Sequence, residues 1–123
     1  STSQIYAKRG GARLFMVLLD PNGQRGMLRV RLYLTSEDDA RMVHRTLLNT
    51  RLPSDSEIMP PALTQPASAG EKRHVVVDVL APVIGLFDGA TNSAEKAERL
   101  RDLVEAVLAS SAKALDASVA SAT

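Results

Sequence analysis

Strict alternation of apolar and polar residues marks the segment Met27–Leu34, which reads Met-Leu-Arg-Val-Arg-Leu-Tyr-Leu. A period of two residues is typical of a β-strand with one buried face. The segment Arg13–Leu19 before it is almost wholly apolar, and the turn-favouring run Asp20-Pro21-Asn22-Gly23 separates the two. Strand, Asn-Gly turn and strand together predict a β-hairpin. Gln4–Arg9 is a further short candidate strand.

The segment Ser36–Asn49 supports two interpretations. As a helix it would begin with Ser36 as the cap and carry three acidic residues in its first turn, beside the positive end of the helix dipole. As a strand it would place neighbouring residues such as Met42 and Val43 on opposite faces. The capping pattern slightly favours the helix on local grounds, and the sequence leaves both open.

The segment Pro53–Gly70 holds four prolines and shows little hydrophobic periodicity, so we expect a long loop of about 18 residues. Loops of that length inside a domain are often functional, although a plain linker is an equal alternative. Its apolar residues Ile58, Met59 and Leu63 are isolated along the chain. We therefore expect the loop to contact other copies rather than to join the core.

The last third of the chain predicts one strand and two helices. Arg73–Leu80 is rich in valine, and we expect that strand to continue past Pro82 to Phe87. Asn92 and Glu95 form a capping-box pattern at the start of a helix. We expect the first helix to break or bend at Ser110-Ser111, before an alanine-rich helix over 112–122. The apolar stripe of the first helix consists of Leu100, Leu103, Val104, Val107 and Leu108.

Strands first and helices last indicate an α+β fold, an antiparallel sheet followed by two C-terminal helices. The 123 residues suit a single domain, 1–123, with strands over about 4–87 and helices over about 92–121. Aromatic residues make up only 3% of the chain, so the core must be aliphatic. A core with few large rings buries less area per side chain, and we expect a second subunit to contribute to stability.

Charge and cysteine content add little by themselves. Fifteen basic and fourteen acidic residues nearly cancel, but the first 51 residues hold nine basic and four acidic ones. A basic front is a weak indication of a polyanion on one surface. Without cysteines there is neither a disulfide framework nor a thiolate metal site, and no apolar run is long enough to predict a membrane span.

The polar face of Met27–Leu34 carries the most informative chemistry. Arg29, Arg31 and Tyr33 alternate with the apolar residues and therefore share one face. Guanidinium groups bind phosphate and a tyrosine ring stacks on an unpaired base, so these three residues are candidates for RNA binding. A solvated strand face is the alternative, since antiparallel sheets often leave one face wet. Further RNA-binding candidates are Lys8, Arg13 and Arg45.

Catalytic and metal-binding patterns are not found in the sequence. His44 and His74 are the only histidines, and His74 and Asp78 would lie about 13 Å apart along one strand, too far to share a metal. Neither a nucleophile elbow nor a phosphate-binding glycine loop occurs. We expect a protein that is not an enzyme and binds no cofactor or metal.

The order of these parts resembles the coat proteins of single-stranded RNA bacteriophages. A basic alternating hairpin precedes a long loop, and a valine-rich strand leads into Ala90-Thr91-Asn92-Ser93. An acidic-headed helix and an alanine-rich helix then complete the chain. The Ala-Thr-Asn-Ser entry to the helix is similar to that of such coats, and the resemblance is best over Arg73–Thr123. It also favours a strand over Ser36–Asn49.

The resemblance implies an intertwined homodimer that builds an icosahedral virus shell around the RNA genome in the host bacterial cytoplasm. It implies that the two helices pack onto the sheet of the partner, which would make the stripe from Leu100 to Leu108 a dimer interface. It further implies an RNA hairpin bound on the inner sheet face, with repression of translation. The alternative is a non-enzymatic adaptor or regulatory module that dimerises through its sheet or its last helix.

Overall fold

The fold was analysed in a computed structural model that describes residues 6–9, 14–19, 26–53, 55–64 and 73–122. Its elements are β1 (Tyr6–Arg9), β2 (Leu14–Leu19), β3 (Met27–Leu34), α1 (Glu37–Leu48), β4 (Glu57–Ile58), β5 (Ala62–Leu63), β6 (Val75–Pro82), α2 (Val83–Leu86) and α3 (Ser93–Ala122). All described strand pairs are antiparallel. The expected α+β class, an antiparallel sheet with C-terminal helices, is confirmed.

The sheet has the strand order β1-β2-β3-β6-β4, and β5 also pairs with β6. The predicted hairpin is confirmed by the antiparallel pairing of β2 with β3, in which Val17 lies opposite Arg31. β6 pairs with β3 along its whole length, so that Arg31 also lies opposite Asp78. β3 and β6 are the longest strands, with eight residues each; buried positions alternate strictly along β3, whereas β6 begins with three buried valines.

The segment expected as one long loop contributes to the sheet. Glu57 and Ile58 pair with Leu80 and Val79, and β5 pairs with the start of β6. Ile58 packs against the hydrophobic core, which differs from the expectation that the apolar residues here stand apart from it. The physical reason is that β6 has a free edge, whose backbone groups need partners that the two short strands supply.

Residues 37–48 are helical, so the strand interpretation that the coat-protein resemblance favours is wrong for this segment. The side chain of Ser36 accepts a hydrogen bond from the backbone N–H of Asp39 at 3.1 Å, as the capping pattern predicts. Ala40, Val43 and Leu47 form the buried stripe of α1. Local capping and a stripe of helical period agree here, and together they decide the element.

Two expectations for the C-terminal third need correction. The strand does not continue to Phe87, because it ends at Pro82, and Val83–Leu86 form the short helix α2. The break expected at Ser110-Ser111 is also absent, since α3 runs continuously over 30 residues. The buried hydroxyl of Ser111 donates to the carbonyl of Val107 at 2.7 Å, which satisfies it inside the helix.

The start of α3 is a capping box, as predicted. The backbone N–H of Glu95 donates to Oδ1 of Asn92 at 2.9 Å, and the Glu95 carboxylate accepts from the backbone N–H of Thr91 at 2.8 Å. Hydrogen bonds from Thr91 lower the pKa of the Glu95 carboxyl below its ordinary value, because they stabilise its charged form.

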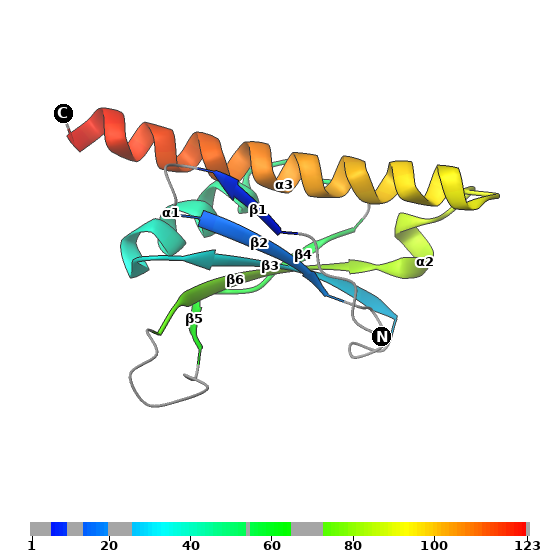
Figure 1. The fold of residues 1–123 in the computed structure, drawn as a ribbon, viewed down its shortest axis with the longest axis horizontal. Helices are drawn as coiled ribbons and strands as arrows, with labels where there is room; N and C mark the ends of the chain where they lie inside the picture. The colour runs from blue at the N-terminus through cyan, green and yellow to red at the C-terminus, as the bar shows by residue number, and fades with distance from the viewer. Residues whose placement is uncertain (1–5, 10–13, 20–25, 54, 65–72, 123) are drawn as a thin grey trace.

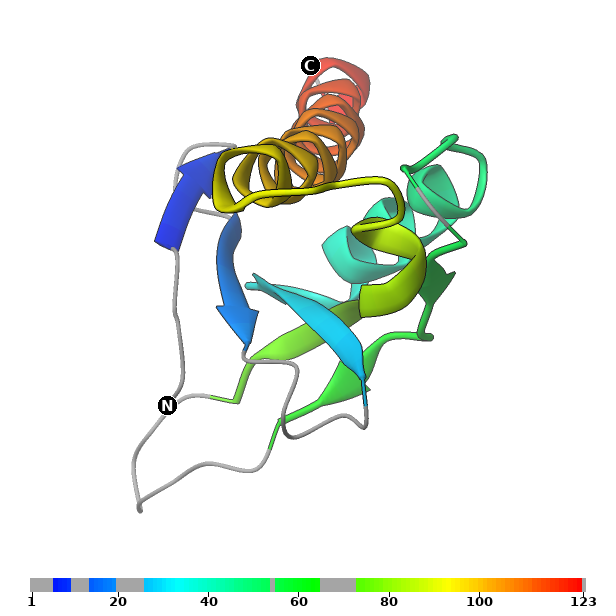
Figure 2. The same ribbon diagram turned by 90° about the vertical axis from the view of Figure 1, so that its right-hand side faces the viewer.

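One layer of helices covers one face of the sheet. Figure 1 shows α3 lying across the sheet with α1 at one end and α2 at the other, and Figure 2 shows the same layers with α3 viewed end-on. The core consists of the inward residues of β3 and β6 together with the buried faces of α1, α2 and α3. None of the described helices covers the opposite face of the sheet, which is called the open face below.

Candidate nucleic-acid interface

The open face carries the polar residues of β3. The inward residues Leu28, Val30, Leu32 and Leu34 are buried, whereas Arg29, Arg31 and Tyr33 are half-buried on the other side. The strand alternation therefore brings the three predicted RNA-binding residues together on one surface, as the sequence indicates. Their exposure leaves them accessible to a partner molecule, but their chemistry depends on the neighbouring strand.

Asp78 of β6 forms an ion pair with Arg31 across the strands. Nε of Arg31 donates to Oδ1 of Asp78 at 2.9 Å, and a terminal nitrogen donates to Oδ2 at 3.0 Å. This two-pronged hydrogen bonding to Asp78, with a smaller contribution from Tyr33, raises the pKa of Arg31 above its ordinary value. Arg31 is thus held in place and its charge is neutralised by a carboxylate.

Arg29 has more unused bonding capacity than Arg31. Its Nη1 atom lies 3.9 Å from Oδ2 of Asp78, which is an ionic contact too long for a hydrogen bond. Its Nε atom is buried and has no hydrogen-bond acceptor within the described part of the chain. Two guanidinium groups share one carboxylate, so this cluster carries a net charge of +1. Arg29 is the group with donors to offer to an anion.

Tyr33 and His74 form an aromatic pair at the β5 end of the open face. Their ring centroids lie 5.7 Å apart with the planes at 89°, an edge-to-face arrangement. His74, Val76 and Asp78 alternate along one segment and share the open face. Val76, the middle one, lies opposite Tyr33. The pair restricts the tyrosine ring, and a restricted ring loses less side-chain entropy when a flat group stacks on it.

Of the other predicted RNA-binding residues, Arg45 lies away from this cluster. Arg45 is exposed on α1, in the helix layer on the far side of the sheet from Arg29 and Arg31. Lys8 is a backbone partner of Phe15 in the β1–β2 pair, and its side chain is not among those the structure describes. Arg13 lies outside the described residues. Arg45 is therefore separate from the surface that carries Arg29, Arg31 and Tyr33.

The stripe assigned to a dimer interface is buried within the chain itself. Leu103 and Val107 are 0% exposed, Val104 and Leu108 are nearly as buried, and Leu100 packs partly against the same core. These residues contact the core formed by the chain's own sheet and α1, so they need no second subunit to cover them. The inference of a partner from this stripe alone is corrected: a long helix folded back over its own sheet meets the same requirement.

Sequence reasoning missed Asp78 as the residue that neutralises Arg31. The spacing of His74 and Asp78 places both on one face of their strand, but no local pattern says which strand lies beside it. It also missed Glu57, an exposed acidic residue opposite Leu80, and hence on the same open face. If Met27–Leu34 had been paired with the valine-rich strand in the sequence analysis, a contact between Arg31 and Asp78 could have been considered.

The structure offers little for other kinds of site. No group of three or more histidine, aspartate or glutamate residues lies close enough to hold a metal among residues 6–9, 14–19, 26–53, 55–64 and 73–122. Across that same part of the chain no helix is both long and apolar enough to traverse a bilayer. Comparisons with protein-family models, curated proteins and solved structures found no match to this chain.

Proposed function

We propose that this chain is a non-enzymatic coat protein of a single-stranded RNA bacteriophage, which assembles into an icosahedral shell and binds RNA on the open face. The observation that carries the proposal is a sheet with one face closed by helices and the other presenting Arg29, Arg31 and Tyr33 along β3. The Ala90-Thr91-Asn92-Ser93 entry to α3 adds the resemblance to such coats.

On this proposal each group on the open face has its own role. Arg29 donates to a phosphate oxygen from its terminal nitrogens, one of which is held only by the 3.9 Å ionic contact with Asp78. Tyr33 stacks on an unpaired base, a contact worth about 1–3 kcal/mol. Arg31 stays paired with Asp78 and lies between Arg29 and Tyr33 on β3.

We further propose that the unit of assembly is a homodimer. A single copy offers one small patch of net charge +1, and a twofold partner doubles that patch into a broader surface for a folded RNA. An intertwined dimer requires α3 to lie on the sheet of the partner. Exchange of an identical helix between two copies preserves every contact that α3 makes with its own chain, so the buried stripe is compatible with it.

Size-exclusion chromatography of the expressed protein, with absorbance at 260 and 280 nm and electron microscopy of the void fraction, tests the proposal. We expect closed particles that contain RNA protected from added nuclease. Arg29→Ala should reduce the RNA content, while Glu57→Gln, a substitution on the same face that removes no arginine, should not. A chain that elutes only as a monomer or dimer and carries no nucleic acid would contradict the coat assignment.

That second outcome is the one expected for an adaptor or regulatory dimerisation module. Two observations support that alternative: Arg31 is neutralised by Asp78, and the largest apolar stripe of α3 is already covered. A module of this kind would bind RNA no more tightly after Asp78→Asn than before.

A further inference from the structure

The histidine at the β5 end of the open face is fixed both by its backbone and by its ring. The backbone N–H of His74 donates to Oγ1 of Thr64 at 3.1 Å, and its carbonyl accepts from the backbone N–H of Thr64 at 2.9 Å and from its hydroxyl at 3.2 Å. The half-buried ring lies edge-to-face with that of Tyr33, with 5.7 Å between the two centroids. A ring held in this way has a defined place beside anything that stacks on the tyrosine.

The polar groups of the open face follow one another along the direction of β3. Arg29 lies at the α2 end, and the ion pair of Arg31 comes next. Tyr33 and His74 lie together at the other end. Arg29 lies opposite Leu80, six positions beyond His74, so these two ends are separated by about 20 Å along the strand direction. A single strand of RNA that extends from a phosphate on Arg29 across the Tyr33 ring therefore reaches His74.

The charge beside Tyr33 changes if His74 takes up a proton. Histidine is the side chain that ordinarily changes its charge between about pH 5 and pH 8. The ring of Tyr33 and the hydroxyl of Thr64 face His74 from β3 and from the end of β5, and side chains of these two types keep their protons in that range. In its own segment the exposed Arg73 precedes His74, and Asp78, which follows it, is already paired with an arginine of β3.

We propose that His74 in its protonated form contacts the phosphate of the nucleotide whose base stacks on Tyr33, so that RNA binding takes up a proton from solvent. This inference rests on the proposed RNA function of the open face and adds a dependence on pH to it. A neutral imidazole has one N–H donor, whereas the protonated ring has two donors and a positive charge. Hydrogen bonds between charged partners are about twice as strong as neutral ones. Because RNA prefers the protonated ring, its affinity must rise as the pH falls through the range in which histidine titrates.

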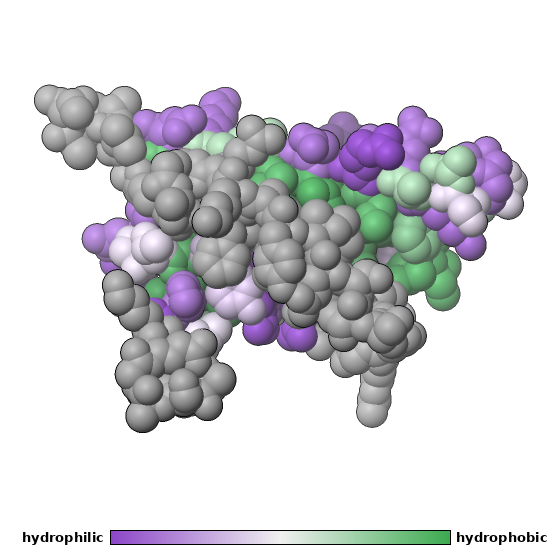
Figure 3. All heavy atoms as spheres, viewed as in Figure 1, coloured by the Kyte–Doolittle hydropathy of each residue, from purple (hydrophilic) through white to green (hydrophobic). Residues whose placement is uncertain are grey.

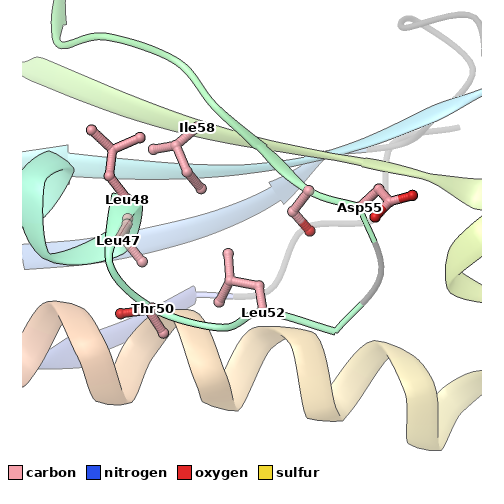
Figure 4. A pocket seen from close by; sticks show the side chains of 7 residues that line it. Leu47, Leu48, Thr50, Leu52, Asp55 and Ile58 are labelled. Carbon is pink, nitrogen blue, oxygen red and sulfur yellow. The ribbon is translucent and has the colours of Figure 1, made fainter.

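The other histidine of the chain provides the matched control. His44 is half-buried on α1, in the helix layer on the far side of the sheet, and the chain has two histidines in all. The last turn of α1 lines a hollow that also has the carboxylate of Asp55 in its lining (Figure 4), and a carboxylate repels phosphate. Figure 3 shows a hydrophilic outer surface along α3, where both signs of charge alternate, as in Arg101 and Asp102. Protonation of His44 should therefore leave RNA binding on the open face unchanged.

The experiment measures the affinity of the full-length protein for a labelled single-stranded RNA at constant ionic strength, with each variant checked by circular dichroism. We expect the unaltered protein and His44→Gln to bind about tenfold or more tightly at about pH 5.5 than at about pH 8. His74→Gln should bind as weakly at the lower pH as at the higher one. His74→Lys should bind tightly at both, because lysine keeps its charge across this range.

The lysine variant separates a charge contact from a merely structural role of the ring. Equal weakening of binding in His74→Gln and His74→Lys would show that the ring only holds Tyr33 in place, and would overturn the inference. Equal affinity of the unaltered protein at both pH values, or a pH dependence that persists in His74→Gln, would also overturn it while RNA binding on the open face stands. Absence of RNA binding at every pH would contradict the proposed function itself, and this inference with it.

Discussion

The substitution Asp78→Asn is the sharpest test of how the open face works, because one carboxylate sits between two guanidinium groups. The side chains of Arg31 and Asp78 are 23% and 15% exposed, so the pair is partly shielded from water. Asparagine keeps one oxygen for Arg31 and replaces the other by a donor. Hydrogen bonds to charged groups contribute about 1.5–3 kcal/mol each, and we expect a loss of about 1–3 kcal/mol in the free energy of unfolding.

The same substitution changes the charge that RNA meets from +1 to +2, since the two arginines no longer share a counter-charge. Each phosphate neutralised on a single strand changes the slope of log affinity against log salt by about −0.7. Release of Arg31 should therefore make the slope steeper by about 0.7. Between about 50 and 200 mM salt the variant should lose about threefold more affinity than the unaltered protein, and it should bind more tightly at the low end.

The assay is the affinity for a labelled single-stranded RNA over that salt range, together with urea unfolding of both proteins. Glu57→Gln is the matched control, because it removes one negative charge from the same face without releasing an arginine. An unchanged slope in Asp78→Asn, or an equal change in Glu57→Gln, would refute the role given to the ion pair. Weaker binding at low salt would show instead that the fixed position of Arg31 matters more than its free charge.

Three other outcomes are expected. Tyr33→Ala should weaken RNA binding by about 1–3 kcal/mol in the same titrations with the salt slope unchanged, since stacking neutralises no phosphate; a changed slope would speak against stacking. Leu103→Ala should lower the free energy of unfolding by about 2–5 kcal/mol in urea, because the residue is 0% exposed, and a loss under 1 kcal/mol would be inconsistent with that burial. The pKa of Glu95 is lowered by its bonds to Thr91, so its contribution to stability is present above the ordinary pKa and lost as pH falls through the folded value. Thermal unfolding against pH should show this loss in the unaltered protein and not in Glu95→Gln.

Local sequence determined the elements whose stabilising groups are close in the chain. The alternation over Met27–Leu34 predicted a strand with Arg29 and Tyr33 on one face, because a pleated backbone turns successive side chains to opposite sides. Ser36 and Glu95 predicted helix starts, because a capping side chain bonds to backbone groups within three or four residues. These interactions need no knowledge of the rest of the fold.

Only the tertiary structure decided which residues meet across the sheet and what covers the last helix. The pairing of Arg31 with Asp78 joins residues 47 positions apart, and a shift of one residue in the register would have turned the carboxylate to the other face. Leu103 and Val107 are buried within the chain itself. The amphipathic pattern of their helix would be the same if the sheet of a partner subunit covered it. A sequence pattern states that a surface must be buried, and the choice of its partner depends on contacts that no local pattern contains.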